Sequence, residues 1–271
     1  MQISRIIDQA GEECLVARDA EGVFRRVRLR GPYDWQSLEV VGEPVAPRRF
    51  LSPVAPAAIL CVAGNYRKHV EECQAEHFPE PVLFMKNPAS ATGHGEPIVI
   101  PAVCADEVDY ECELAVVIGK SCREVTAAEA SGYILGYTAA NDVSARLWQL
   151  ERGGGQWVRG KGFDTFCPLG PWLVTPDEMP DPGNLRLQTL LNGEVMQDAR
   201  TAQMTGSIFE IIAFLSQGTT LLPGTVILTG TPEGVGWARS PRRTLQAGDE
   251  VIVRIEGLGD LRNPVKKETA S

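Results

Sequence analysis

The chain of 271 residues lacks the features that mark several protein classes. It has no excess of positive charge, since 26 lysine and arginine residues face 35 acidic ones, for a formal net charge of −9. Nucleic-acid binders need a basic surface that neutralises phosphates, so this balance argues against that function. The sequence also lacks a long apolar run, and its first residues have no apolar core of a signal peptide. A cytoplasmic protein is the expectation.

The cysteines are odd in number and lack CxxC spacing, so neither a disulfide framework nor a zinc site is expected. Several, such as Cys61 and Cys112, lie in apolar runs and are predicted to be small buried hydrophobic residues. With 44% hydrophobic and 23% charged residues, the composition is that of an ordinary globular protein. The length allows one large domain, or one domain with a small appendage.

The sequence divides near a proline-containing stretch from Pro44 to Pro56. Residues 1 to about 50 read as short strands with a turn at 19–22, and they form the predicted small N-terminal β subdomain (1–50). Residues 57–271 form the predicted catalytic domain. Within it, apolar runs predict buried strands over 57–63, 109–119, 133–140, 226–228 and 250–255.

Local signals add turns and a few helices to these strands. Asn192-Gly193 between two apolar runs predicts a two-residue hairpin. Ser207, followed by Glu210, predicts the capped start of an amphipathic helix. Residues 65–77 have helical potential, and 127–130 predict a short helix. Many strands with few helices predict a β-rich α+β fold rather than a doubly wound one.

Two acidic residues at the start of the 109–119 strand are the most informative feature of the chain. Side chains alternate along a strand, so Glu111 and Glu113 point to one face. Neighbouring carboxylates beside an apolar strand repel each other and lose hydration, and a hard divalent cation such as Mg²⁺ or Mn²⁺ would compensate. Asp142 follows the 133–140 strand and would complete a set of three carboxylates. The alternatives are a solvated strand end for the glutamates and an ordinary turn residue for Asp142.

Three further segments carry candidate chemistry. Residues 155–161 have the G-x-x-x-x-G-K spacing of a phosphate loop, but Gly162 replaces the required Ser or Thr, so nucleotide binding is disfavoured and Lys161 remains a candidate cation for a substrate oxygen. His69 and Glu72 are three residues apart, so on a helix the carboxylate would orient the imidazole as a base. A solvated helix face is the alternative. Thr229 to Gly236 offers hydroxyls and amides for an anionic substrate, or simply a turn.

Taken in order, these segments resemble the fumarylacetoacetate hydrolase family. The likeness is greatest to the fumarylacetoacetate hydrolase domain-containing proteins and to bacterial relatives named hydroxyheptadienedioate isomerases. The resemblance covers about residues 57 to 255, and no single motif decides it. The segments that carry it are Gly64-Asn65-Tyr66 with His69 and Glu72, Leu83-Phe84-Met85-Lys86, residues 109–120, residues 141–146, residues 161–171 and Leu228-Thr229-Gly230-Thr231-Pro232.

The resemblance implies a role for each matching residue. It makes Glu111, Glu113 and Asp142 the ligands of Mg²⁺ or Mn²⁺. It makes His69 and Glu72 a catalytic dyad on a lid segment, and it adds Lys161 to the catalytic residues. It assigns substrate or oxyanion binding to Lys86, Arg146, Gln149 and Thr231. The implied fold is a mixed β-sandwich roll, usually a homodimer.

The implied activity is hydrolysis of a C–C bond in a small anionic 2-oxo acid, such as an acylpyruvate or fumarylpyruvate-like compound, through a metal-stabilised enolate. The same enolate would serve decarboxylation or tautomerisation of oxaloacetate, or isomerisation of 2-hydroxyhepta-2,4-diene-1,7-dioate. These reactions are the alternative prediction at the same site. A non-catalytic metal- or acid-binding protein is the third hypothesis, and it is disfavoured because all the carboxylates, the dyad and Lys161 are present together.

Overall fold

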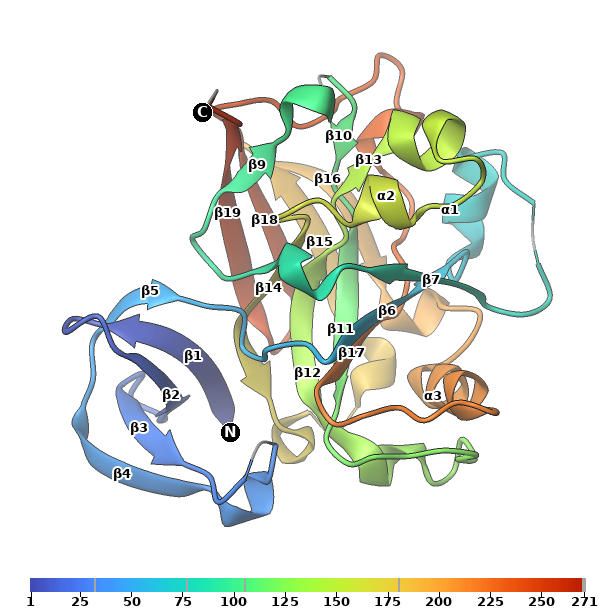
Figure 1. Cartoon of the computed structure of the whole chain (residues 1–271). Coiled ribbons are helices and arrows are strands. Elements are labelled where there is room, and N and C mark those ends of the chain that lie inside the picture. The colour runs from blue at the N-terminus through green and yellow to red at the C-terminus, as the bar shows by residue number, and fades with distance from the viewer. Residues whose placement is uncertain (32, 77, 105, 180, 270–271) are drawn as a thin grey trace.

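In the computed structural model, which describes residues 1–31, 33–76, 78–104, 106–179 and 181–269, one mixed sheet of twelve strands runs across the molecule (Figure 1). Ten of these strands follow one another in hydrogen-bonded order: β4 (Glu39–Pro44), β3 (Phe24–Arg28), β2 (Glu13–Arg18), β1 (Gln2–Asp8), β14 (Cys167–Val174), β12 (Ile134–Asn141), β11 (Cys112–Ile118), β17 (Thr225–Leu228), β6 (Ala58–Ala63) and β7 (Val82–Lys86). The other two are β5 (Pro47–Phe50), which pairs with β1, and β8 (Ala91–Thr92), which pairs with β14.

A second, five-stranded sheet packs against the centre of the first. Its order is β16 (Glu194–Arg200), β15 (Arg186–Leu191), β18 (Glu250–Ile255), β19 (Gly259–Lys267) and β9 (Ile98–Ile100). A two-stranded ladder joins β10 (Val108–Asp109) to β13 (Ser144–Ala145). The α-helices of the described residues are short: α1 (Arg67–Glu72), α2 (Val158–Lys161) and α3 (Ile208–Ser216). The predicted β-rich α+β fold with mixed sheets is therefore confirmed.

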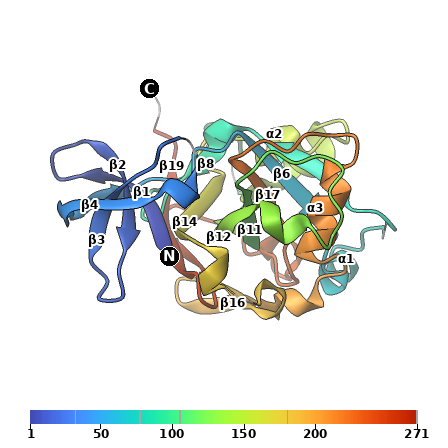
Figure 2. The same ribbon diagram turned by 90° about the horizontal axis from the view of Figure 1, so that it is seen from below.

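The N-terminal strands β1 to β5 lie to one side of the remaining structure in both views (Figures 1 and 2). Their sheet is continuous with the main one, because Gln2 pairs with Val174 and Ile3 with Leu173. The stretch expected to form the boundary includes β5, which pairs with β1. A division between a subdomain 1–50 and a catalytic domain 57–271 stays a prediction.

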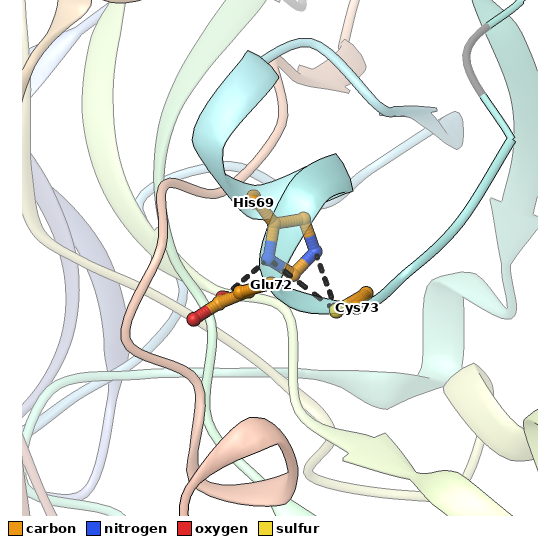
Figure 3. Close-up of side chains that lie close together, drawn as sticks. All are labelled: His69, Glu72 and Cys73. Atoms are coloured by element: carbon orange, nitrogen blue, oxygen red, sulfur yellow. Dashed lines mark hydrogen bonds and ion pairs between the residues drawn. The ribbon is translucent and has the colours of Figure 1, made fainter.

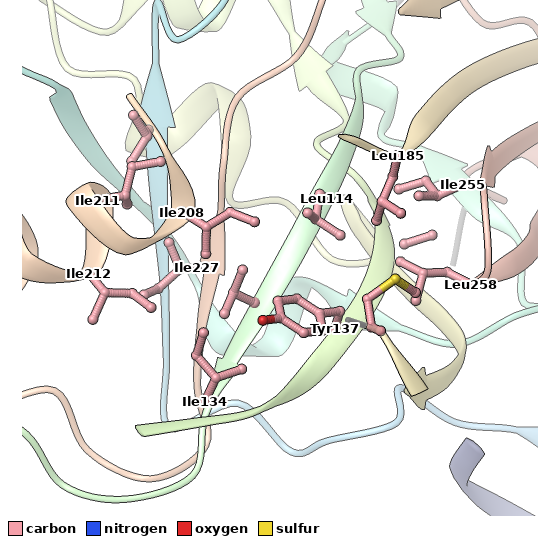
Figure 4. Close-up of a cluster of buried hydrophobic side chains, with 14 of the residues drawn as sticks. Leu114, Ile134, Tyr137, Leu185, Ile208, Ile211, Ile212, Ile227, Ile255 and Leu258 are labelled. Atoms are coloured by element: carbon pink, nitrogen blue, oxygen red, sulfur yellow. The ribbon is translucent and has the colours of Figure 1, made fainter. Parts of the chain in front are cut away.

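The main hydrophobic core lies between the two sheets and beneath α3 (Figure 4). Leu114, Tyr137 and Ile227 face it from the large sheet, and Ile255 faces it from the smaller one. The amphipathic face of α3 closes the core with Ile208, Ile211, Ile212 and Leu215, all nearly or fully buried. Cys61 and Cys112 are completely buried, as predicted, and the cysteines are free. No helix of the described residues is long and apolar enough to cross a membrane.

Local signals predicted most of the turns and caps. Ser207 and Glu210 form a reciprocal capping box at the start of α3. Asn192 and Gly193 connect β15 to β16 with φ values of 52° and 85°, as the two-residue hairpin requires. The predicted helix at 127–130 is wrong: residues 127–129 form a turn and a 3₁₀ helix follows at Ala130–Tyr133. A longer helix does not form here because Gly132 has low helix propensity and a strand starts at Ile134.

We expect Gly193→Ala to lower the free energy of unfolding by about 1–2 kcal/mol, because alanine strains the left-handed conformation. A Cβ at Gly193 would meet no atom within 4 Å, so the cost comes from the backbone alone. Gly132→Ala is the matched control, since a Cβ there is also free of contacts and the φ angle is not in the left-handed region. Urea denaturation of both variants measures the difference, and equal stabilities would contradict the assigned turn.

Candidate active site

A cavity of about 510 Å³ lies beside the start of β11, between α1, α2 and the segment that follows β17. In Figure 1, α1 and α2 lie at the same end of the molecule as β10 and β13. Of the site residues predicted from the sequence, Lys86 does not line the cavity, and the others do: His69, Glu72, Glu111, Glu113, Asp142, Arg146, Gln149, Lys161 and Thr231. The fold thus brings segments far apart in the sequence into one site.

Strand pairing brings the three predicted metal ligands together. Cys112 of β11 pairs with Asn141 of β12, so Glu111 and Glu113 lie beside the residue that follows β12. The backbone amide of Asp142 donates to the carbonyl oxygen of Glu111 over 2.9 Å, which fixes that end of the pairing. Carboxylate oxygens of Glu111, Glu113 and Asp142 lie within 4.8 Å of one another, and all three residues are buried.

Three buried cations hold two of these carboxylates. Lys161 Nζ donates to Glu111 Oε2 and to Asp142 Oδ2, both over 2.7 Å. Arg146 Nη1 donates to Glu111 Oε1 over 2.5 Å, and Lys86 Nζ donates to Asp142 Oδ1 over 2.5 Å. Lys161 belongs to a helical turn, α2, where the sequence suggested a loop, and its side chain is occupied by the protein's own carboxylates. This arrangement leaves no phosphate loop in the described residues around Lys161.

Glu111, just before β11, and Glu113, within it, have opposite electrostatic environments. Burial raises the pKa of Glu111, but Lys161 and Arg146 outweigh it and hold that pKa well below its ordinary value. Burial raises the pKa of Glu113 well above its ordinary value, and the charges of Asp142 and Glu111 raise it further. The site therefore keeps Glu111 ionised and makes the charge of Glu113 costly.

A divalent cation fits the environment of Glu113. Among the described residues, this carboxylate accepts a hydrogen bond from the backbone amide of Gly230 over 2.6 Å and forms no ion pair with a lysine or arginine. With all four buried acids Asp109, Glu111, Glu113 and Asp142 ionised, they would face three buried cations and leave one negative charge in excess. Clustered carboxylate oxygens are the donors that Mg²⁺ and Mn²⁺ prefer, and the residues present fit such an ion.

The predicted dyad lies on α1 and faces the same cavity. His69 Nδ1 and Glu72 Oε1 are 2.9 Å apart, and Glu72 Oε2 accepts the amide hydrogen of Gly234 over 2.9 Å. Cys73, at the end of α1, places its sulfur 3.8 Å from His69 Nδ1 (Figure 3). Burial lowers the pKa of His69, but hydrogen bonds with Cys73 and Glu72 outweigh it and raise that pKa to about 9.

The residues predicted to bind substrate have protein partners of their own. Gln149 Oε1 accepts a hydrogen bond from Arg146 over 3.1 Å. The hydroxyl of Thr231 donates to the carbonyl of Cys112 and accepts from Gln197. Lys86 also donates to the carbonyl of Val143 and lies behind Asp142, away from the cavity, so its position suits orientation of Asp142. Contact of these side chains with a substrate stays a prediction.

Two residues that complete this network were missed by the sequence analysis. Asp109 accepts two hydrogen bonds from Arg146, over 3.0 and 2.8 Å, and one from the amide of Gly236. The sequence could have indicated Asp109, because every second residue from 109 to 113 is acidic. Gln197 of β16 donates to Thr231 and accepts from the amide of Cys112. Nothing near Gln197 in the sequence marks it, since only the packing of the second sheet brings it there.

Comparisons with known proteins agree with this architecture. The family model described as the fumarylacetoacetate (FAA) hydrolase C-terminal domain matches residues 58–266. The human mitochondrial oxaloacetate tautomerase FAHD2A is 48% identical over 226 residues, which cover 82% of this chain and 72% of that protein. Among solved structures, 2-hydroxyhepta-2,4-diene-1,7-dioate isomerase from Mycobacterium marinum is 38% identical with a TM-score of 0.83, and the match covers 100% of each chain. The 5-carboxymethyl-2-hydroxymuconate delta-isomerase from Mycobacterium smegmatis is 40% identical with a TM-score of 0.84, covering 99% of this chain and 100% of that one.

We expect Glu113→Gln to stabilise the protein in EDTA by about 1 kcal/mol or more at pH 7.5, because an amide removes a buried charge that is poorly compensated. The raised pKa of Glu113 gives the sign: its contribution to stability is present at low pH and is lost as the pH rises through that pKa. Saturating Mg²⁺ or Mn²⁺ should instead stabilise the wild type by about 2–3 kcal/mol at one hundred times the dissociation constant, and the variant by less.

Guanidinium denaturation with EDTA and with each ion measures both effects. Glu194→Gln, an exposed substitution on β16, is the control and should change neither. If Glu113→Gln weakened the metal-free protein and left the stabilisation by the ions unchanged, the assignment of Glu113 as a metal ligand would be wrong.

Proposed function

The chain belongs to the fumarylacetoacetate hydrolase family, and we propose that this enzyme interconverts the enol and keto forms of a small 2-oxo acid such as oxaloacetate. The observation that supports this reaction most directly is one cavity that contains both a buried carboxylate–lysine cluster and the His69–Glu72 dyad. The cluster suits binding of the 2-oxo acid end, and the dyad suits transfer of a proton.

The proposed substrate end is a carboxylate next to a keto or enol oxygen. A divalent ion held by Glu111, Glu113 and Asp142 would supply positive charge for these two oxygens. Lys161 is buried, and burial lowers its pKa, but Asp142 and Glu111 outweigh this and raise that pKa, so its ammonium keeps its charge. That fixed charge would stabilise negative charge on the C2 oxygen while the proton moves.

The dyad then transfers the proton to or from C3. Because Nδ1 of His69 faces Glu72, the substrate would meet Nε2, which has only a long contact of 4.0 Å with Cys73 Sγ. In the enol-to-keto direction, Nε2 of the imidazolium donates a proton to C3, the C2–C3 double bond becomes single and C2 gains its double bond to oxygen. The hydroxyl proton leaves to water, and His69 regains a proton from water. No atom is gained or lost, and the reverse steps form the enol.

The named relatives favour this reaction over hydrolysis. An oxaloacetate tautomerase and two isomerases are among the similar proteins, and each of these names describes the movement of a proton and a double bond. C–C bond hydrolysis of an acylpyruvate is the second candidate, since a neutral His69 oriented by Glu72 would also deprotonate water. The homodimer, the use of Mg²⁺ or Mn²⁺ in the cell and the cytoplasmic location stay predictions.

We expect the protein with Mg²⁺ to accelerate conversion of enol-oxaloacetate to its keto form, followed by the loss of enol absorbance. His69→Asn should reduce kcat/KM by about 10²–10⁴-fold, because proton transfer loses its side chain. Glu71→Gln, on the same helix and exposed, is the control and should retain activity. Pyruvate release from acetylpyruvate, with no effect on the oxaloacetate enol, would support hydrolysis instead.

The pH dependence distinguishes the two reactions. Donation to C3 needs the imidazolium, so kcat/KM for the enol-to-keto direction should fall as the pH rises through about 9, the pKa of His69. Hydrolysis needs neutral imidazole and would increase over the same range. Hydrogen bonds with Cys73 and Glu72 raise this pKa, and Glu72→Gln weakens the second of them, so the transition should move down by about one pH unit. A pH–rate profile of wild type, Glu72→Gln and Glu71→Gln measures the shift, and an unmoved transition would exclude His69 as its source.

A further inference from the structure

A second group of metal-ligating side chains lies on α1, apart from the oxygen cluster. His69, Glu72 and Cys73 have the helical spacing i, i+3 and i+4, so one face of the helix carries an imidazole, a carboxylate and a thiol (Figure 3). One ligand atom from each lies within 4.8 Å of the others. The absence of CxxC spacing predicted no zinc site, but this cluster needs only a single cysteine.

The distances are close to those of a four-coordinate zinc site. Zinc lies about 2.0 Å from nitrogen and about 2.3 Å from sulfur, so a tetrahedral ion places these two atoms about 3.5 Å apart. His69 Nδ1 and Cys73 Sγ are 3.8 Å apart. His69 Nδ1 and Glu72 Oε1 are 2.9 Å apart, and an ion between them would separate them to about 3.3 Å. Cys73 Sγ is also 4.0 Å from His69 Nε2, so the sulfur does not lie in line with Nδ1, and the exposed Cys73 side chain would have to rotate to bind an ion held by His69 Nδ1 and Glu72 Oε1.

We propose that His69, Glu72 and Cys73 form a binding site for Zn²⁺ or a similar borderline-soft divalent ion, and that this ion inhibits the enzyme. The ion takes the place of the proton between Nδ1 and Glu72 Oε1 and binds the thiolate of Cys73. The thiol proton and the imidazolium proton are released to water. Three protein ligands leave one position of a tetrahedral ion for water.

The donor set separates this site from the carboxylate cluster. Imidazole and thiolate select zinc or cobalt over magnesium, whereas Glu111, Glu113 and Asp142 offer only oxygen. Cys73 is exposed, so an ion reaches the site without opening the core. The neighbouring lysine, Lys68, pairs with Glu233 over 3.3 Å rather than with this group. Glu72 Oε2 can keep its bond to the amide of Gly234 while Oε1 binds the ion.

The metal site itself is independent of the proposed reaction, and only its inhibitory effect rests on the role proposed for His69. An imidazole that binds an ion through Nδ1 keeps its Nε2 hydrogen, but losing that hydrogen would leave an imidazolate, so it is a much poorer proton donor to C3 than the imidazolium. Zn²⁺ would thus suppress activity that Mg²⁺ supports at the other site. Mg²⁺ would support the reaction in this cavity, and Zn²⁺ would inhibit it.

Co²⁺ tests the site without turnover, because a thiolate ligand gives it an intense near-ultraviolet charge-transfer band that oxygen ligands do not give. The protein is saturated with Mg²⁺ and titrated with Co²⁺. We expect a band that saturates at one equivalent, disappears on addition of Zn²⁺ and is absent in Cys73→Ser. Cys14→Ser, a half-buried cysteine on the N-terminal strand β2, is the matched control and should keep the band.

Zinc affinity gives a second readout. In a competition titration, Cys73→Ser should bind Zn²⁺ at least about tenfold more weakly than the wild type, since it loses a direct ligand. Melting curves verify that the variant is folded. Absence of the thiolate band in the wild type, or its persistence in Cys73→Ser, would overturn the proposed site. If the band behaves as expected but oxaloacetate is not a substrate, the site stands and the proposed reaction is wrong.

Discussion

Lys161 donates to Glu111 and Asp142 from a position with almost no contact with solvent, and the rest of the site is arranged around this buried bridge. Removing an ammonium group and two carboxylates from water costs several kcal/mol for each ion, and Coulomb attraction offsets this only where further hydrogen bonds are well placed. Arg146 and Lys86 supply them, one to each carboxylate. A buried cluster of this kind contributes little to stability, so its presence is better explained by ligand binding than by folding.

The β-sheet register makes the cluster possible. Glu111 immediately precedes β11 and Asp142 immediately follows its antiparallel neighbour β12, and a shift of one residue in the pairing would turn Glu113 toward the hydrophobic core. The core side of β11 is filled by Cys112, Leu114 and Val116, which pack against the second sheet. Burial of these apolar residues therefore fixes the register, and the register in turn fixes the spacing of the carboxylates. The packing of the core thereby determines the geometry of the carboxylate cluster.

The sequence predicted those parts of the molecule that depend on neighbours along the chain. The capping box at Ser207, the Asn192-Gly193 hairpin and the apolar strands need only local information, and the alternation at Glu111 and Glu113 was already visible. Gln197 and the position of Lys86 behind Asp142 depend on contacts between distant strands, so no local pattern indicated them. The order of the family motifs did predict the site, because a family shares one fold and that fold determines which distant residues come together. Local spacing does not contain this information.

The segment after β17 links the two halves of the cavity in a way that its sequence did not indicate. Its amides were candidates for binding an anionic substrate, with an ordinary turn as the alternative, and three of them donate to acids of the protein: Gly230 to Glu113, Gly234 to Glu72 and Gly236 to Asp109, over 2.6, 2.9 and 2.9 Å. Gly230 and Gly234 have φ values of 100° and 102°, which a side chain would strain. One segment therefore sets the positions of a metal-ligand candidate, of the partner of His69 and of the acid that holds Arg146. Glu113, Glu72 and Asp109 therefore depend on the backbone amides of one segment for their positions, rather than on a shared side chain.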